Sequence, residues 1–305
     1  MDERAARAFL QDKLGADARI EVMRPGEWSA AYAVHTRSAD LVARFSAYDE
    51  DFEKDAYAAR YASASLPIPP ILERGPVGGG FYAIAPRMPG GHLDSLDAEG
   101  MRRVLPSFFA ALDAMRAVDA FAGPGYGGWR ADGSTRHTTW RSDLLGVATD
   151  PATRGSPGWR ELLGGSADWI ATFEEGHARM VELLDLCPED RHLVHDDLVN
   201  RNLLTDADRI TAVLDWGSSK YGDFVYDLAK LVFYEPWYPQ WQTIDFAAEA
   251  QAHYDAVGLA VPHFAERLRC YLLHEGIGGM AYNAYRKRWE QVELRARRVL
   301  ELARS

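Results

Sequence analysis

The chain has 305 residues, of which 47% are apolar and 26% are charged. This length and balance predict a soluble globular protein with one large domain or two modest ones. A formal net charge of −11 argues against nucleic acid as a partner, since binding it needs a basic face, and favours a small cationic ligand.

Two cysteines, Cys187 and Cys270, form no CxxC motif, so we expect a reduced chain without a structural zinc. The first segment, MDERAARAFLQDKLG, predicts a charged amphipathic helix rather than a secretory signal. No stretch approaches the roughly 18 uninterrupted apolar residues of a membrane span. These features predict a cytoplasmic protein without a membrane partner, and they carry no signal for an oligomeric state.

Residues 1–86 show an α+β pattern. We expect a helix over about residues 3–14 that ends at Gly15, and strands at RIEVM, SAAYAVHT, DLVARFS and FYAIAPRM. Between the last two strands, EDFEKDAYAARYASAS has helical spacing, and the prolines of LPIPP end it. The pattern predicts a small sheet domain with one inserted helix.

Residues 87–95, RMPGGHLDS, have the composition of a linker. After them the chain is mainly helical over 96–305, beginning with DAEGMRRVLPSFFAALDAMRAVDAF and continuing with GSADWIATFEEGHARMVELLDLC. The residues from 245 onward are almost wholly helical in pattern. We therefore predict a bilobal α+β fold with a β-rich N-terminal lobe, a hinge linker and a larger, mainly helical C-terminal lobe.

The segment HLVHDDLVNRNLLTDADRITAVLDWG, residues 192–217, concentrates polar residues between apolar ones. NLL and ITAVLDW have the pattern of two strands, and the aspartates of TDADR between them suit a tight turn. Because a hairpin brings its outer ends together, we expect Asn202 and Asp215 to lie side by side. Asp197, just before the hairpin, should face the same space.

These three side chains can divide the work of phosphoryl transfer. A carboxylate and a carboxamide offer the oxygen ligands that Mg²⁺ prefers, and the other carboxylate can accept a proton from a hydroxyl nucleophile. The order His-x-Asp-x4-Asn, followed by Asp at a strand end, is the layout of protein kinases, with Asp215-Trp216-Gly217 in place of Asp-Phe-Gly. Each motif alone is more often a cap or a turn. Their joint spacing predicts a kinase-like catalytic loop.

Further stretches make the likeness more specific: PGEWSAAYAV, ASASLPIPPIL, RHTTWRSDLL and GDFVYDLAKLVFYEPW. With them the chain resembles the aminoglycoside phosphotransferase family, a branch of the protein-kinase-like fold, over roughly residues 10–245. LPIPPIL and HTTW are similar to the part of that family that phosphorylates hygromycin B. The resemblance implies that Asp227 ties its helix to the catalytic loop.

The resemblance also implies roles around the catalytic loop. Asp197 corresponds to the catalytic base, His195 to a residue that braces the loop, and Asn202 and Asp215 to the magnesium ligands. Asp196 departs from the small residue expected beside the histidine. The spacing to Asn202 favours Asp197 as the base.

On the nucleotide side, Gly26 and Ser29 can place a backbone N–H and a hydroxyl near phosphates, although a plain hairpin explains them equally well. Arg44 stands where a kinase has a strand lysine, and the resemblance implies that it grips phosphate. An acid of the following helix should pair with it. The candidates are Glu53 and Asp55, of which we favour Asp55.

The segment AIAPRM should receive adenine through backbone hydrogen bonds of Ala85, Arg87 and Met88. GPGYGG, residues 123–128, matches GxGxxG, but it follows a helix and runs into a polar loop. We interpret it as a turn near the acceptor cleft rather than a dinucleotide fingerprint. The chain also lacks the GxxxxGK[ST] motif of P-loop kinases.

The acceptor side should combine acids with aromatic faces, which suit ammonium groups and sugar rings. The candidates are Glu235, Trp237, Tyr238, Asp255 and Glu275. Aromatic residues at helical spacing are also typical of a protein core, so these assignments are the least constrained by the sequence.

The sequence thus predicts an ATP- and Mg²⁺-dependent O-phosphotransferase, with GTP as the alternative donor. Its expected acceptor is a cationic aminoglycoside or aminocyclitol antibiotic, hygromycin B first, and its expected effect is resistance. A second hypothesis keeps the chemistry and changes the acceptor to choline, homoserine, methylthioribose, a fructosamine or a macrolide. A third is a nucleotide-binding protein without turnover.

Overall fold

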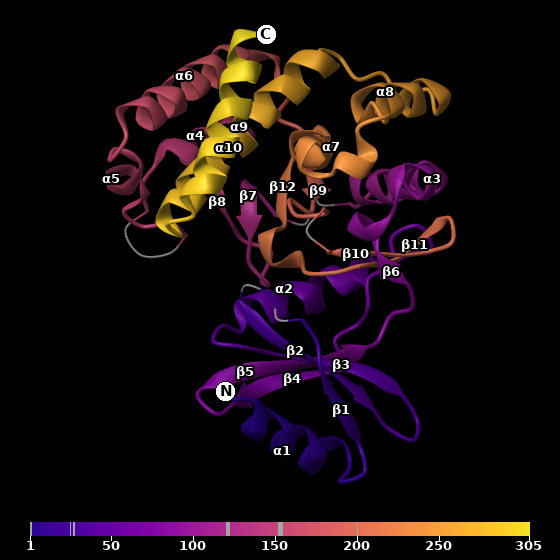
Figure 1. The fold of residues 1–305 in the computed structure, drawn as a ribbon. Coiled ribbons are helices and arrows are strands. Elements are labelled where there is room, and N and C mark those ends of the chain that lie inside the picture. Colours follow the sequence, from indigo (N-terminus) through magenta and orange to yellow (C-terminus); the bar gives the residue numbers. More distant parts are fainter. Residues whose placement is uncertain (1, 25, 27, 120–122, 152–154, 200) are drawn as a thin grey trace.

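The computed structural model describes residues 2–24, 26, 28–119, 123–151, 155–199 and 201–305. The chain forms two lobes, one built on a sheet and one mainly helical, with helix α2 (Glu50–Ala58) between them (Figure 1). None of the helices in these ranges combines the length and apolarity needed to cross a membrane.

The N-terminal lobe is one antiparallel sheet with a helix against it. In chain order its elements are α1 (Glu3–Leu14), β1 (Arg19–Val22), β2 (Ser29–His35), β3 (Asp40–Ser46), α2, β4 (Glu73–Val77) and β5 (Gly80–Pro86). The strand order is β1-β2-β3-β5-β4. As predicted, α1 ends at Gly15, whose φ of 116° is readily adopted only by glycine.

Strand β4 has no counterpart among the predicted strands. Its sequence, ERGPV, contains a glycine and a proline, both of which weaken a strand pattern. It lies at the edge of the sheet and pairs only with β5, so Pro76 removes no hydrogen bond from an interior ladder.

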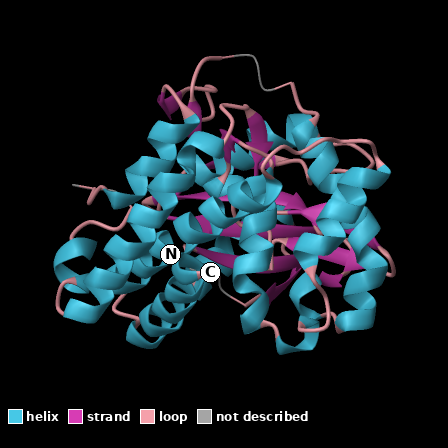
Figure 2. Ribbon diagram, turned by 90° about the horizontal axis from the view of Figure 1, so that it is seen from above, coloured by secondary structure: helices cyan, strands magenta, loops and turns pink. Residues whose placement is uncertain are grey.

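The C-terminal lobe contains most of the helices, which cover most of it when seen from above (Figure 2). Its helices are α3 (Ala98–Arg116), α4 (Trp140–Leu145), α5 (Trp159–Leu163), α6 (Ala167–Leu183), α7 (Val225–Tyr234), α8 (Phe246–Ala256), α9 (Phe264–Tyr285) and α10 (Trp289–Arg304). Its strands are β6 (Gly91–His92), β7 (Tyr126–Trp129), β8 (Thr135–His137), β9 (His192–Val194), β10 (Leu203–Asp206), β11 (Arg209–Val213) and β12 (Lys220–Gly222). They form two small sheets, ordered β11-β10-β6 and β8-β7-β12-β9.

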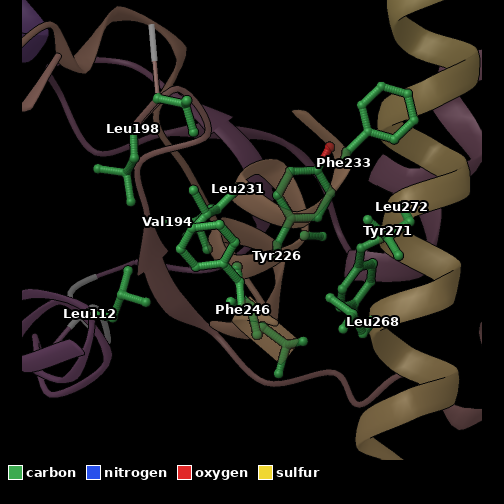
Figure 3. Packing of buried hydrophobic residues seen from close by; sticks show 14 of the residues in the cluster. Leu112, Val194, Leu198, Tyr226, Leu231, Phe233, Phe246, Leu268, Tyr271 and Leu272 are labelled. Atoms are coloured by element: carbon green, nitrogen blue, oxygen red, sulfur yellow. The ribbon is translucent and has the colours of Figure 1, made fainter. Parts of the chain in front are cut away.

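The hydrophobic residues form two separate cores. One joins α1 to the N-terminal sheet, and the larger one fills the helical lobe. Figure 3 shows part of the larger core, where Tyr226, Leu231 and Phe233 of α7 pack near Leu268 and Tyr271 of α9. Ala58 at the end of α2 belongs to the larger core although α2 lies within the N-terminal segment of the sequence.

Two segments differ from their predicted form. The predicted linker 87–95 contains β6, which pairs with β10, so the hairpin holds this end of the linker. GPGYGG enters strand β7, which pairs with β8 and β12, and is therefore part of a sheet rather than a free turn.

Candidate active site

The predicted hairpin exists and aligns two of the three candidate polar groups. Leu203 lies opposite Val213 in the β10–β11 pairing, and the Leu214 N–H donates to the carbonyl of Asn202 at 2.8 Å. Asn202 therefore sits across from the residue that precedes Asp215, as the hairpin argument predicted.

Asp197 belongs to the same group. The Asn202 side-chain amide donates to the backbone carbonyl of Asp197 at 2.7 Å and to its carboxylate at 2.9 Å. With the nitrogen of the amide committed in this way, its oxygen is the atom that remains for a ligand. Asn202 is buried, so its orientation is fixed by these two bonds.

His195 connects the loop to the hairpin. Its Nδ1 accepts from the Asp197 N–H at 3.2 Å, and its Nε2 lies 2.9 Å from the Leu214 carbonyl. This arrangement fits a neutral ring that carries its proton on Nε2. The ring is fully buried and lies edge-on to Trp216, with centroids 4.6 Å apart. These contacts are those of a structural brace.

Asp227, near the start of α7, anchors the backbone of the loop that contains His195 and Asp197. Its two carboxylate oxygens accept the backbone N–H groups of His195 and Asp196 at 2.9 and 2.8 Å. Burial raises the pKa of Asp227 to about 7 although both hydrogen bonds oppose the shift. The predicted tie between this helix and the catalytic loop is confirmed.

The structure separates the two adjacent aspartates. Asp196 has a left-handed backbone (φ 63°), and its carboxylate contacts Lys220 at 2.9 Å and Lys230 at 3.5 Å. Asp197 instead contacts Asn202. The neighbours thus point to different surroundings, and only Asp197 has the predicted position for a base.

Arg44 of β3 pairs with Asp55 of α2, and its guanidinium also lies over the Phe52 ring at 5.1 Å. The preference for Asp55 is confirmed, because Glu53 instead pairs with Arg74. The second oxygen of Asp55 accepts the Trp216 N–H at 2.8 Å. This helix therefore links the strand arginine to the turn after Asp215.

Negative charge accumulates around Asp215. Burial and the nearby carboxylates of Asp55 and Asp51 raise the pKa of Asp215, while Arg44 opposes the shift. A divalent cation beside Asp215 and the free oxygen of Asn202 would relieve this repulsion, so these residues fit a metal site. In the described parts of the chain, no group of three His, Cys, Asp or Glu side chains can hold a metal alone. A cation here needs further oxygens from a nucleotide and water, as Mg²⁺ usually has.

The predicted phosphate loop is corrected in part. The Gly26 N–H donates to the Ser29 carbonyl at 3.0 Å, so this turn already uses the donor that was assigned to phosphate. Ser29 lines a cavity of about 380 Å³ with Gly26 and Trp28, at the start of β2. Its hydroxyl remains the polar candidate of this loop.

The pairing of β5 shows which backbone groups can meet adenine. The Arg87 N–H donates to the Asp40 carbonyl at 2.9 Å, and Ala85 pairs with β3 in the same register. Because backbone groups of an antiparallel strand alternate in direction, Ala85 and Arg87 face β3, whereas Pro86 and Met88 face the other side. The prediction is corrected for Ala85 and Arg87, whose backbone groups pair with β3, whereas the Pro86 carbonyl and the Met88 N–H face away from it.

Two predicted acceptor acids have different surroundings. Glu275 on α9 contacts Lys230 at 3.1 Å and accepts from the Tyr234 hydroxyl at 3.1 Å, so its charge is already paired. Asp255 is exposed on α8 and accepts from Gln251 one turn earlier. The assignment of Glu275 is corrected, since periodicity does not reveal a residue's partners, and that of Asp255 stays a prediction.

The two aromatic candidates also differ in their surroundings. Trp237 packs on Phe233 (5.7 Å between centroids) with the Arg295 guanidinium over its ring, as a core residue does. Tyr238 stacks on Trp241 at 4.5 Å. Burial, with smaller contributions from Asp94, Tyr234 and Asp197, raises the pKa of Tyr238 to about 12, which places this residue near the candidate base.

Glu235 is half-buried, and burial raises its pKa. Arg298 lowers this pKa and Asp245 raises it further, so the charges that act on Glu235 belong to α10 and the start of α8. Of the five predicted acceptor residues, Tyr238 is therefore the one that the structure brings towards the catalytic loop.

The sequence did not single out three lysines around this site. Lys220 and Lys230 neutralise Asp196, and Lys54 contacts the turn after Asp215. No spacing rule marks the first two. The only signal for Lys54 was its position next to Asp55 on an amphipathic helix.

Buried histidines predict that the protein loses stability in acid. Burial lowers the pKa of His195 to about 4 and that of His274 to about 3. A histidine of the unfolded chain titrates near 6.5, so below this pH the unfolded state binds more protons than the folded state. The contribution of each histidine to the free energy of unfolding should fall by roughly 1.4 kcal/mol per pH unit between about pH 6 and 4. Asp227, whose pKa of about 7 in the folded protein lies above its unfolded value, offsets the share of one histidine in this range.

Urea unfolding at a series of pH values measures this slope. His274→Gln should reduce the slope of the unfolding free energy against pH by the contribution of one histidine. His263→Gln, at an exposed position, should leave it unchanged. Equal slopes in the wild type and His274→Gln would contradict the prediction.

Comparisons with known proteins agree with this geometry. A family described as the phosphotransferase enzyme family matches residues 22–273. Hygromycin-B 4-O-kinase of Escherichia coli is 32% identical over 273 residues, which cover 88% of this chain and 76% of that protein.

Solved structures show the same fold. A thermostable mutant of aminoglycoside phosphotransferase APH(4)-Ia, in a ternary complex with AMP-PNP and hygromycin B, superposes with a TM-score of 0.86 at 28% identity, covering 98% of each chain. Aminoglycoside 2'-phosphotransferase-IIIa, in a GDP complex, gives a TM-score of 0.71 at 12% identity over 99% of each chain. The predicted bilobal α+β, kinase-like fold is confirmed. The chain belongs to the phosphotransferase enzyme family, and it is a phosphotransferase that acts on a hydroxyl group.

Proposed function

We propose that this protein transfers the terminal phosphoryl group of ATP to a hydroxyl of hygromycin B or a closely related aminocyclitol antibiotic, and so confers resistance. The observation that carries the proposal is the convergence of Asp197, Asn202 and Asp215 at the end of one hairpin. The Arg44–Asp55 pair supports it, because both of its charges act on Asp215. The identity of 32% to hygromycin-B 4-O-kinase supports the choice of acceptor.

In this proposal, residues 1–86 bind the nucleotide, 87–95 form the hinge, and 96–305 carry the catalytic and acceptor-binding groups. Arg44 and Ser29 contact phosphate, and the backbone of Pro86 and Met88 contacts adenine. Dependence on ATP favours action in the cytoplasm. GTP is the alternative donor. Turnover measured with ATP and with GTP under the same conditions distinguishes the two.

The chemistry follows from the site. Asp197 accepts the proton of the acceptor hydroxyl as its oxygen bonds to the γ-phosphorus, while the bond from that phosphorus to the β,γ-bridging oxygen breaks and ADP leaves. The oxygens of Asn202 and Asp215 would hold Mg²⁺, which would supply positive charge to the phosphate oxygens. Arg44, oriented by Asp55, stabilises the negative charge of the nucleotide. A cationic acceptor is attracted by a protein of net charge −11.

The proposal is tested with purified protein, ATP, Mg²⁺ and a panel of acceptors. The panel contains hygromycin B, other aminoglycosides, choline, homoserine, methylthioribose, a fructosamine and a macrolide. Turnover of hygromycin B to a product carrying one phosphate, together with protection of a sensitive host, is the expected result. Turnover of another panel member alone would replace the acceptor and keep the chemistry.

Arg44→Ala should raise the KM for ATP about 10- to 100-fold, which is the size of a lost charge-assisted hydrogen bond of ~1.5–3 kcal/mol. The KM for the acceptor should stay the same, because Arg44 lies on β3 of the N-terminal sheet. Arg74→Ala is the matched control, since Arg74 also pairs with acids at α2, Asp49 and Glu53. An unchanged KM for ATP in Arg44→Ala would remove Arg44 from the phosphate site.

A further inference from the structure

Lys54 is a buried cation that joins the two lobes. It lies on α2, only 3% of it is exposed, and its Nζ donates to the carbonyls of Gly217 at 2.7 Å and Ser219 at 2.9 Å. The same Nζ lies 4.8 Å from the centre of the Trp129 ring. All of these partners belong to the C-terminal lobe, so the helix is fastened to that lobe by the side chain of Lys54.

The neighbouring residue holds the same turn. Asp55 accepts the Trp216 N–H at 2.8 Å, while Lys54 binds the carbonyls of Gly217 and Ser219. Two consecutive residues of α2 thus form hydrogen bonds with three backbone groups within residues 216–219. A β-carbon on Gly217 would lie 3.0 Å from the Asp51 carboxylate, so glycine permits this close approach of the helix.

This turn, residues 216–219, directly follows Asp215. That residue has a left-handed backbone, with φ 62° and ψ 73°, which costs energy for residues other than glycine, although aspartate adopts it more readily than most. The hydrogen bonds from α2 begin at the next residue. They therefore supply part of the constraint on the backbone that carries the Asp215 carboxylate.

The charge of Lys54 is costly to bury. Burial lowers the pKa of Lys54 to about 8, against the attraction of Asp51 and the weaker attraction of Asp196 and Asp55. An apolar side chain of the same length would avoid this cost and still fill the space. The feature that an apolar residue cannot supply is the pair of hydrogen bonds to the turn.

We propose that Lys54 is a positioning residue that fixes the turn after Asp215 and thereby presets the metal ligand, while keeping α2 against the C-terminal lobe. The proposal rests on the proposed function, because it assumes a metal–nucleotide complex at Asp215. It predicts that the site is assembled before the nucleotide arrives. Lys54 does not touch the reacting groups and acts through the backbone of residues 216–219.

Two measurements test this role without an acceptor. The first is the affinity of Mn²⁺ for the protein in the presence of ADP, which should weaken about 10- to 100-fold in Lys54→Met, as when other groups that orient metal ligands are removed. The second is amide hydrogen exchange in residues 216–219, which should become faster in the same variant. Lys54→Arg, which keeps the charge and donors, should restore part of both. Lys13→Met, in the N-terminal lobe, should change neither.

The outcomes separate the two proposals. If the wild type does not bind Mn²⁺ with ADP, the proposed function fails. If the wild type binds and Lys54→Met binds as tightly with unchanged exchange, the role of Lys54 is overturned. Should Lys54→Met fail to fold, Lys54→Gln, which keeps one donor without the charge, is judged by the same two criteria.

Discussion

Asp197→Asn is expected to lower kcat by about 10²–10⁴-fold, the contribution of a positioned general base. Asparagine has the shape of aspartate but cannot accept the proton of the acceptor hydroxyl. Its oxygen can still receive the amide of Asn202, which donates to the Asp197 carboxylate at 2.9 Å in the wild type. The loop should therefore keep its conformation, and the loss should appear in the chemical step.

Binding and turnover are measured separately for this variant. ATP should bind with wild-type affinity because Arg44 and Asp215 are unchanged. The matched control is Asp208→Asn, at an exposed position in the turn between β10 and β11, which should have wild-type kcat. Equal kcat in Asp197→Asn and the wild type would contradict the assignment of the base. If neither turns over any acceptor while both bind ATP, the nucleotide-binding hypothesis prevails.

Asp227→Ala is expected to lower the free energy of unfolding by about 2–6 kcal/mol, the largest loss among the variants proposed for this protein. The reason is that each buried N–H left without an acceptor costs ~1–3 kcal/mol. The two N–H groups belong to His195 and Asp196, directly before the base. The kcat should fall as well, since the loop that positions Asp197 loses its anchor. Asp227→Asn keeps one acceptor oxygen and turns an N–H₂ towards the second N–H, so its loss should lie between wild type and alanine.

Urea unfolding measures these differences, and kcat is determined under conditions where each variant is folded. Asp255→Asn is the matched control, because Asp255 is exposed on α8 and bonds only within its own helix. It should change the free energy of unfolding by less than about 0.5 kcal/mol. A stability of Asp227→Ala equal to that of this control would show that the loop does not depend on Asp227.

The sequence was informative where a local pattern decides the structure. The period of apolar residues defined α1, α3 and α6, and the turn residues of TDADR defined the β10–β11 hairpin. That hairpin predicted the neighbourhood of Asn202 and Asp215, because pairing register follows from the turn. Strand β4 was not predicted because an edge strand can contain proline and glycine, which weaken the strand pattern in the sequence.

The acceptor side shows the opposite case. Glu275 looked like a free acid on a helix, but Lys230, 45 residues earlier, pairs with it. Asp255 looked equivalent to Glu275 in the sequence and lies on an exposed face. Whether a carboxylate is paired depends on which other segment packs against it, and that information is not carried by spacing within one helix.

By itself, the sequence determined the order of most elements, the kinase-like hairpin, and the choice of Asp197, Asn202 and Asp215, because each depends on a continuous stretch such as residues 197–215. Only the tertiary structure decided which charges meet across the chain. It turned Asp196 towards two lysines, and it set Lys54 against carbonyls more than 160 residues further on. The physical reason is that charged side chains are stabilised by whatever the folded chain brings within a few ångströms, and such contacts form only when the lobes have packed.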